Sequence, residues 1–365
     1  MIDFSEVSNQ LPKSDLINAA LHSLKEAESD AFFAIAVNKA EIHQKKQSTF
    51  KGQDFKNIYI VSNQTNFSQL SSHIAANKIT FISQNFFLQQ DLQGLKNRFE
   101  KSLVIMTNNI FAEIGAINFS KIYQSTPHTI YAVHDYDNHH WLQNSIQIAL
   151  LADVYIPAHQ ENYLICSRLN PNVIGGIPCG SNQWSMDFIK NLKIPLHTVR
   201  RKDDPLGKYY FYEKFVYRNK VIRTLESTYP SITILQNDFH ALTQEQKWEE
   251  WASHKLHWII PVLNDLPIRF FDALITGGIP LVPSGLTPHI EALGIPKKFY
   301  SSYGPLDILG PKRIVEANLS KFENLGKAGI TERAQYAIEN YHVDRTAEKI
   351  ISKTLELYGI KKLSL

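Results

Sequence analysis

Short apolar, β-branched runs alternate with longer amphipathic stretches along most of the chain, and this alternation predicts parallel sheets with helical crossovers. The first half should open with an amphipathic helix over 15–46 and use crossover helices over 64–77 and 88–101. Its predicted strands are Asn57–Ser62, Lys78–Ser83, Ser102–Asn108, Thr129–His134 and Asp153–Ala158. Because helical crossovers place helices on both faces of a parallel sheet, we expect an α/β fold with buried strands.

A composition shift at 173–184 (VIGGIPCGSNQW), with its three glycines and one proline, predicts a linker between two domains. Beyond it the alternation restarts. The predicted strands are 197–201, 232–235, 257–261, 279–283 and a short one near Phe299, and the predicted helices are 209–228, 243–254, 267–276 and those of the tail over 331–358. The sequence therefore predicts two βα domains, 1–178 and 179–330, followed by C-terminal helices over 331–365.

Length and composition narrow the class of protein. A chain of 365 residues suits two domains, and 44% hydrophobic residues exclude disordered, collagen-like and coiled-coil classes. The formal charge of +3 is too small to indicate a nucleic-acid partner. Cys166 and Cys179 can form neither a disulfide framework nor a zinc motif, which favours a reducing compartment. We see no secretory signal and no apolar window long enough for a bilayer, so we expect a cytoplasmic protein.

The densest group of reactive side chains, His134 to His140, follows a predicted strand, where open α/β sheets place their ligands. Three interpretations stay open. The group could hold a metal, and Asp135-Tyr136-Asp137 also satisfies the bare Asp-x-Asp pattern with which some sugar transferases hold a divalent ion against a diphosphate. Alternatively His134, Asp135 or Asp137 contacts substrate or acts as a general base toward an acceptor hydroxyl. The third interpretation is a polar loop that caps a helix starting near His140.

A second candidate is the predicted helix over 267–276. Asn264 or Asp265 is expected to be its N-cap. Asp265, Arg269 and Asp272 recur at i, i+4 and i+7 and would share one polar face. That face is either a surface ion-pair stripe, or it lines a cleft where the helix N-terminus and Arg269 meet a phosphate and a carboxylate contacts sugar hydroxyls.

Several segments, in their order along the chain, resemble the GT-B glycosyltransferases. The segment 272–282 (DALITGGIPLV) is similar to the family's Glu-Ala-x-x-x-Gly-x-Pro-Val-Val segment in the donor domain. The segments 152–158, 171–173 and 177–182 resemble the last N-domain strand and the interdomain linker, and His134-Asp135 matches an acceptor-side histidine or aspartate. Arg200-Arg201-Lys202, with Gly207-Lys208 shortly after, resembles the basic pair that grips the donor diphosphate.

This resemblance implies two Rossmann-like domains that face each other across a cleft, with a C-terminal helix returning to the first domain. The second domain would bind a nucleotide-sugar donor without a divalent metal or other cofactor, and the first would present the acceptor to His134, Asp135 and Asp137. In an inverting reaction Asp135 or His134 would deprotonate the acceptor hydroxyl, and in a retaining one these residues would position the sugar. The implied donor-binding residues are Arg200, Arg201, Lys208, Asn264, Asp265, Arg269 and Asp272.

The sequence departs from the family where retaining members carry two glutamates eight positions apart, since Asn264 and Asp272 stand there. It also shows no glycine-rich loop of the usual kind in the first domain. The donor and the stereochemistry therefore stay open. The expected reaction moves a sugar to a glycan or lipid-linked acceptor, in capsule or lipopolysaccharide biosynthesis. The slight basicity and Lys361-Lys362 are compatible with an acceptor at the inner face of a membrane.

Three alternatives remain. A GT-B-fold sugar-nucleotide epimerase would use the carboxylates as acid and base in the same cleft. A metal-dependent enzyme would use the His134–His140 cluster. A non-catalytic module would bind a sugar nucleotide without turnover.

Overall fold

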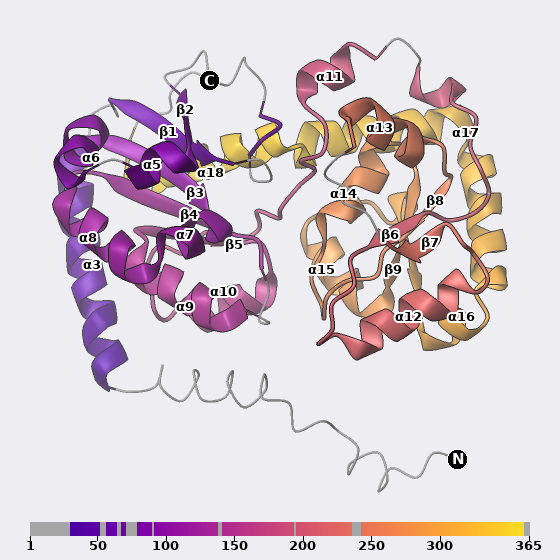
Figure 1. Ribbon diagram of the computed structural model, residues 1–365, viewed down its shortest axis with the longest axis horizontal. Helices are drawn as coiled ribbons and strands as arrows, with labels where there is room; N and C mark the ends of the chain where they lie inside the picture. The colour runs from indigo at the N-terminus through magenta and orange to yellow at the C-terminus, as the bar shows by residue number, and fades with distance from the viewer. Residues whose placement is uncertain are drawn as a thin grey trace, which may run out of the picture.

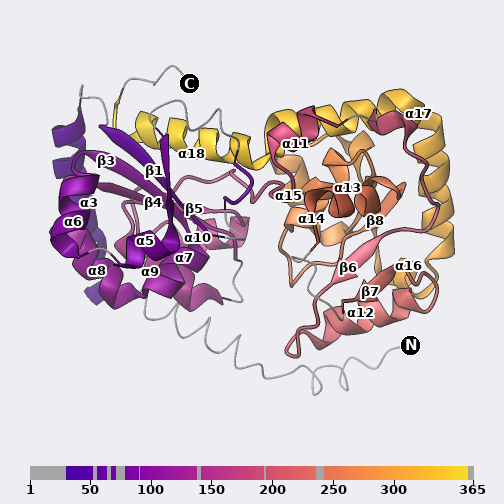
Figure 2. The same cartoon turned by 45° about the horizontal axis from the view of Figure 1, so that its top comes forward.

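The computed structural model describes residues 30–51, 56–63, 67–70, 79–89, 91–137, 141–192, 195–235 and 242–360. It has two α/β lobes, each built around parallel strands (Figure 1). Two stretches of chain connect them, the linker near 178–184 and the junction between the helices α17 and α18 (Figures 1 and 2). No helix in these ranges is long and apolar enough to cross a bilayer.

The first lobe holds a five-stranded parallel sheet in the order β2-β1-β3-β4-β5. Its elements are α3 (Asp30–Phe50), β1 (Asn57–Ser62), β2 (Ile79–Ser83), α5 (Gln84–Gln89), α6 (Leu92–Phe99), β3 (Ser102–Thr107), α7 (Asn108–Ile114), α8 (Ala116–Ser125), β4 (Ile130–Asp135), α9 (Leu142–Leu151), β5 (Val154–Pro157) and α10 (Gln160–Cys166). The five strands predicted in this half are confirmed, each to within one residue at either end. The predicted helix over 64–77 lies mostly outside the described residues.

Both faces of this first sheet are covered, so every residue of β3 and β4 is buried. On one face Phe99, Phe111 and Phe119 of the crossover helices pack against the strands. On the other face α18 (Val343–Leu357), from the end of the chain, contributes Ile350 and Leu355 to the core. The apolar runs of the sequence are thus strands that meet helices on both sides.

The second lobe contains three strands in the order β10-β9-β8 and a parallel pair, β6-β7. Its elements are α11 (Met186–Lys190), the 3₁₀ turn η2 (Leu196–Thr198), β6 (Gly207–Tyr209), α12 (Val216–Glu226), β7 (Ile232–Ile234), α13 (Gln244–Ala252), β8 (Leu256–Trp258), α14 (Ile268–Ile275), β9 (Ile279–Pro283), the 3₁₀ turn η4 (Ser284–Leu286), α15 (Thr287–Ala292), the 3₁₀ turn η5 (Lys297–Phe299), β10 (Ser301–Tyr303), α16 (Pro305–Leu309) and α17 (Lys312–Tyr341). Gly326, with φ of 56°, bends α17 in its middle.

The two strand groups of the second lobe join edge to edge, because Leu206, just before β6, pairs with His257 on β8. The N–H of Leu206 donates to the carbonyl of Leu256, and the N–H of Trp258 donates to the carbonyl of Leu206. The combined order is therefore β7-β6-β8-β9-β10. Counted along the chain, this is the same order as in the first lobe, although no internal repeat is visible in the sequence.

The predicted strand over 197–201 is wrong. Residues Leu196–Thr198 form a 3₁₀ turn after Pro195, and the first strand of the lobe is Gly207–Tyr209. Asp203-Asp204-Pro205 interrupts the extended chain between them, because proline fixes φ and supplies no N–H to a ladder. The predicted helix over 209–228 is correspondingly shorter and begins at Val216.

Candidate active site

The strand order gives each sheet a switch point, and open α/β sheets bind ligands in the crevice at the carboxyl ends of the strands there. In the second lobe the switch point lies between β6 and β8. Tyr209, the last residue of β6, donates its hydroxyl to the carbonyl of Trp258, and this hydroxyl accepts from the N–H of Ile260 at 3.0 Å. Tyr209 thus fastens the two strand ends together and carries the site around it.

Two guanidinium groups flank the ring of Tyr209, one from α12 and one from α14. The guanidinium carbons of Arg218 and Arg269 lie 5.1 Å and 5.4 Å from the ring centroid. Arg218 donates to the carbonyl of Tyr210 at 2.8 Å, and Arg269 donates through Nε to the carbonyl of Lys208 at 2.9 Å. Burial and the nearby charge of Arg269 lower the pKa of Arg218. The carbonyls fix both side chains, while Nε of Arg218 has no partner among the described residues.

The carboxyl group of Asp265 completes this cluster. Burial, and to a lesser extent the charge of Asp137, raise its pKa to about 7, against the opposing effect of Arg218 and Arg269. Its Oδ1 is buried and accepts no hydrogen bond within the described part of the chain. Near neutral pH one partly protonated carboxyl therefore stands against two guanidinium groups. The excess positive charge suits an anionic ligand such as a diphosphate.

The start of α14 points its first N–H groups toward the same place, since this helix begins at Ile268, three residues after Asp265. Its N-cap is Pro267, so the expectation that Asn264 or Asp265 caps the helix is wrong. The loop turns at Leu263, whose φ is 55°, and this turn places Asn264 on the surface ahead of the helix.

In the first lobe, His134 and Asp135 end β4 and are completely buried. His134 donates through Nε2 to the carbonyl of Ile177 at 2.9 Å, and burial lowers its pKa to about 4, so the ring is neutral. Asp135 accepts from the hydroxyl of Tyr155 at 2.6 Å and from the N–H of Asp137 at 3.2 Å, and burial raises its pKa to about 6. Both side chains therefore support the loop that follows them.

Asp137 is the partly exposed member of the predicted trio. Its carboxylate accepts from the side chain of Asn108, and its carbonyl accepts from Asn162 at 2.8 Å. The Asp137 charge adds to the effect of burial in raising the pKa of Asp265. Burial raises the pKa of Cys179, and the charges of Asp265 and Asp137 raise it further. Asp137 of the first lobe and Asp265 of the second therefore lie close enough to influence each other electrostatically.

Unpaired buried polar atoms gather at the carboxyl edge of the first sheet. Oγ1 of Thr107, Nδ1 of His134 and the hydroxyl of Tyr136 have no hydrogen-bond partner in the described ranges. Buried polar groups are normally paired, so such atoms indicate where water or a ligand binds. A pocket of about 220 Å³ lies between the lobes and is lined by His159 and Tyr163 from the first lobe and His289 from the second. His159 donates to the carbonyl of Tyr136 at 2.7 Å.

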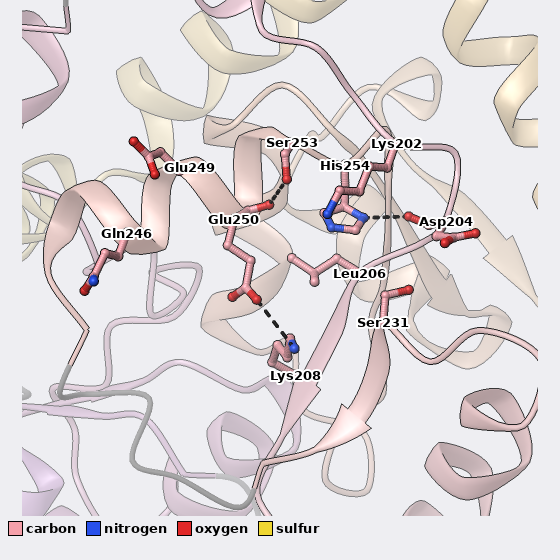
Figure 3. A pocket seen from close by; sticks show the side chains of 10 residues that line it. All are labelled: Lys202, Asp204, Leu206, Lys208, Ser231, Gln246, Glu249, Glu250, Ser253 and His254. Atoms are coloured by element: carbon pink, nitrogen blue, oxygen red, sulfur yellow. Dashed lines mark hydrogen bonds and ion pairs between the residues drawn. The ribbon is translucent and has the colours of Figure 1, made fainter.

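Three of the predicted donor-binding residues have side chains that lie away from the cluster of Tyr209, Arg218, Arg269 and Asp265. Arg200 is exposed. Arg201 donates to the carbonyls of His254 at 3.0 Å and Thr276 at 2.7 Å, so it binds the C-terminal end of α14 rather than its start. Lys208 points to Glu250, with 3.5 Å between Nζ and Oε1, in a pocket of about 500 Å³ next to Lys202 and Asp204 (Figure 3).

Asp272 is buried on α14 and binds the interlobe linker. It accepts from Oγ of Ser181 and from Nε2 of Gln183, both at 2.5 Å. Ser181 in turn accepts from the N–H of Val343 and donates its own N–H to Tyr341, at 2.8 Å and 2.7 Å. The two connections between the lobes are thus joined to each other and to α14, which makes Asp272 a positioning residue for the hinge.

Burial raises the pKa of Asp272 to about 7, above that of an unfolded aspartate. The folded state therefore holds a proton that the unfolded state has released, and this contribution to stability is lost as the pH rises through 7. We expect the free energy of unfolding to fall between about pH 5 and pH 7, by at most about 1.4 kcal/mol per pH unit for this group. Asp135 and Asp265 act in the same direction.

Denaturant unfolding of the wild type and of Asp272→Asn across this pH range measures the effect. The variant should show a shallower decline than the wild type, since Asp135 and Asp265 remain. An equally steep decline in both proteins would show that Asp272 is ionised in the folded state at low pH.

Among the described residues no group of three or more His, Cys, Asp and Glu side chains is placed to hold a metal ion. His139, His140 and Asn138, which contribute to the predicted metal cluster, lie outside those residues, as does the expected helix start at His140. The helix that follows, α9, begins at Leu142.

Sequence reasoning missed Arg218, Tyr209 and Cys179 as site residues. Arg218 lies in a predicted helix, on the face that carries the buried Ile222 and Leu225. An arginine at a position with apolar neighbours at helical spacing is the one feature of the sequence that indicates a functional role for it. The sequence suggests no role for Cys179 beyond excluding a disulfide framework and a zinc motif. The carboxylates of both lobes act on its pKa, and their approach to it depends on how the lobes meet, which no local pattern encodes.

Two examples illustrate which solved structures are similar to this chain. One is a sucrose-phosphate synthase from Thermosynechococcus elongatus, with a TM-score of 0.49, 13% identity, and coverage of 83% of this chain and 99% of that one. The other is the catalytic domain of starch synthase IV from Arabidopsis thaliana bound to ADP and acarbose, with a TM-score of 0.43, 11% identity, and coverage of 75% and 76%. No protein-family model and no curated protein matches the sequence. Because both TM-scores are below 0.5, the function is inferred from the geometry of the site.

Proposed function

We propose that this protein is a glycosyltransferase that moves a sugar from a nucleotide-sugar donor, bound by the second lobe, to an acceptor presented by the first. The observation that carries the proposal is the pair Arg218 and Arg269 around Tyr209, at the switch point of the second sheet. Two fixed guanidinium groups beside a helix N-terminus would neutralise the charge that develops on a leaving diphosphate. This role needs no divalent metal.

Asp137 is the group we propose to act on the acceptor. It is partly exposed, it lies at the carboxyl end of the first sheet, and its charge is near enough to raise the pKa of Asp265. In an inverting reaction it would take the proton of the acceptor hydroxyl as that oxygen attacks the sugar carbon, and in a retaining one it would hold the sugar. His134 and Asp135, which are buried, would position this loop.

We propose both where the acceptor binds and which class of molecule it belongs to. The pocket of about 220 Å³ between the lobes, next to Tyr136, offers room for one sugar ring of a glycan acceptor. That the acceptor belongs to a capsule or lipopolysaccharide, or is lipid-linked at the inner face of a membrane, is proposed from the sequence resemblance alone.

A thermal-shift panel tests the donor site. Nucleoside diphosphates, CMP and their sugars would be added singly, each with and without EDTA, because a ligand that binds the native state raises the melting temperature by mass action. We expect one nucleotide class to raise it, equally with the chelator. No shift with any nucleotide would contradict the donor site, and a shift abolished by EDTA would instead favour a metal-dependent enzyme. Nucleotide release without sugar transfer to any acceptor would favour an epimerase.

A further inference from the structure

Large apolar side chains are exposed at one edge of the second lobe, where α12 begins. Phe211, Tyr212, Val216 and Tyr217 lie within seven consecutive residues, and their exposed fractions run from 44% to 73%. The buried residues of the same helix, such as Ile222 and Leu225, point into the core of the lobe. The exposed group is therefore a second apolar surface, separate from the one that the fold requires.

The helix α16 (Pro305–Leu309), which packs against α12, also exposes large apolar side chains. The two helices lie together in both views of the molecule (Figures 1 and 2). Leu306 and Leu309 are exposed by 79% and 76%, and their spacing of three places them on one side of α16, away from the buried Ile308. Soluble proteins seldom expose neighbouring large apolar side chains without a partner for them.

Positive charges lie beside the apolar side chains. Among residues 211–224 the exposed ionisable groups are Lys214, Lys220 and Arg223 against Glu213, three cations and one anion, a net charge of +2. Val216, Lys220 and Arg223 recur at i, i+4 and i+7, so they share one side of α12. The apolar end of the helix comes first, and the cations follow at about 6 Å and about 10 Å along its axis.

Two hollows beside Phe211 bring the cations and the apolar surface together. One, of about 420 Å³, is lined by Phe211, Val216, Lys220 and Arg223 among others. The second, of about 350 Å³, is lined by Phe211, Arg223 and Ile234, and also by Glu226, whose carboxylate accepts from the hydroxyl of Thr233. Each hollow offers an apolar wall and a cation beside one carboxylate, Glu213 in the first and Glu226 in the second. The cations suit the anionic headgroup of an amphiphile.

We propose that this edge of α12 and α16 docks onto an anionic lipid bilayer. The bilayer offers an apolar layer for the exposed apolar side chains and negative headgroups for the cations that follow them. Phe211, Val216 and Tyr217 enter the headgroup region, where aromatic and apolar side chains favour the boundary between lipid and water. Lys220 and Arg223, one and two turns further along, meet the lipid phosphates. The opposite side of α12 carries Arg218 to the candidate donor site, so docking would hold that site near the membrane. Only this last consequence rests on the proposed function.

Co-sedimentation of the full chain with vesicles tests the proposal. We expect binding to vesicles of phosphatidylcholine mixed with phosphatidylglycerol, and weak binding to phosphatidylcholine alone. Lys220→Glu with Arg223→Glu should weaken the first binding by about tenfold or more, and so should Phe211→Ser with Tyr217→Ser. Added salt should weaken binding by the wild type, because exposed charges are screened.

Matched variants on other surfaces keep the test specific. Ile117→Ser with Leu164→Ser removes two exposed apolar side chains from the first lobe, and Lys121→Glu with Lys327→Glu reverses two exposed charges. Both double variants should bind vesicles like the wild type. Equal loss in these controls, or no binding by the wild type, would overturn the proposal. So would a dimer in solution that the Phe211→Ser with Tyr217→Ser variant converts to a monomer, since a second copy would then cover the surface.

Discussion

Arg269→Met should bind the stabilising nucleoside diphosphate roughly tenfold to a hundredfold more weakly than the wild type, measured by titration calorimetry. A charge-assisted hydrogen bond contributes about 1.5–3 kcal/mol, and each 1.4 kcal/mol is a factor of ten in affinity. Within the described part of the chain, Arg269 is fixed by the carbonyl of Lys208 through Nε, which leaves its terminal nitrogens for the diphosphate. Methionine keeps most of the apolar stem, which limits the loss of packing against Tyr209.

Arg200→Met is the matched control, since Arg200 carries the same charge on the same lobe but is exposed and away from the cluster. Its affinity should stay within about twofold of the wild type, because screened surface charges contribute little. Equal losses in the two variants would show that general positive charge, and not the pair at the switch point, attracts the nucleotide. An unchanged affinity for Arg269→Met would remove this residue from the donor site.

Asp137→Asn should slow release of nucleoside diphosphate from the donor by about a hundredfold or more, while leaving the affinity for the nucleotide nearly unchanged. General acid–base catalysis contributes about 10²–10⁴-fold, and asparagine keeps the shape of the side chain but cannot take a proton. Asp137 belongs to the first lobe, and Arg218 and Arg269 belong to the second, so donor binding and proton transfer should separate in this variant.

The measurement is steady-state turnover of the nucleotide sugar that stabilises the protein, with calorimetry for its nucleoside diphosphate. Asp204→Asn makes the same substitution at an exposed site and should turn over like the wild type. Turnover by Asp137→Asn within about threefold of the wild type would contradict a direct role for this carboxylate. Loss of nucleotide affinity in this variant would move Asp137 from the acceptor side to the donor side.

The alternation of apolar runs and amphipathic stretches was sufficient to predict the strands of the first sheet, because a strand buried on both faces is apolar along its whole length. It failed at β6, where three residues, Gly207–Tyr209, are too few to show a period. The stretch 197–201 has β-branched residues at Thr198 and Val199, yet it is followed by Pro205 before any partner strand is reached. The matching strand order of the lobes depends on pairing between distant residues, which local pattern does not report.

The candidate site could be predicted only in part, because it also depends on contacts between residues that are distant in the sequence. Of the three residues predicted to share one face of a helix, Arg269 and Asp272 lie on α14, whereas Asp265 precedes it. Arg269 and Asp265 meet the site at the start of the helix, and Asp272 is turned to the linker. Helical spacing groups side chains without saying which neighbour each one meets. Arg201 illustrates the limit, since the basic residue that resembled a diphosphate ligand binds carbonyls at the opposite end of α14.

A crystal structure with the stabilising nucleoside diphosphate bound would show whether the second lobe binds the donor at the start of α14. We expect phosphate oxygens within hydrogen-bond distance of Arg269 and Arg218, beside the start of α14 and opposite Asp137 of the first lobe. Phosphates bound instead in the pocket of Lys202 and Lys208, at the other side of β6, would contradict this expectation.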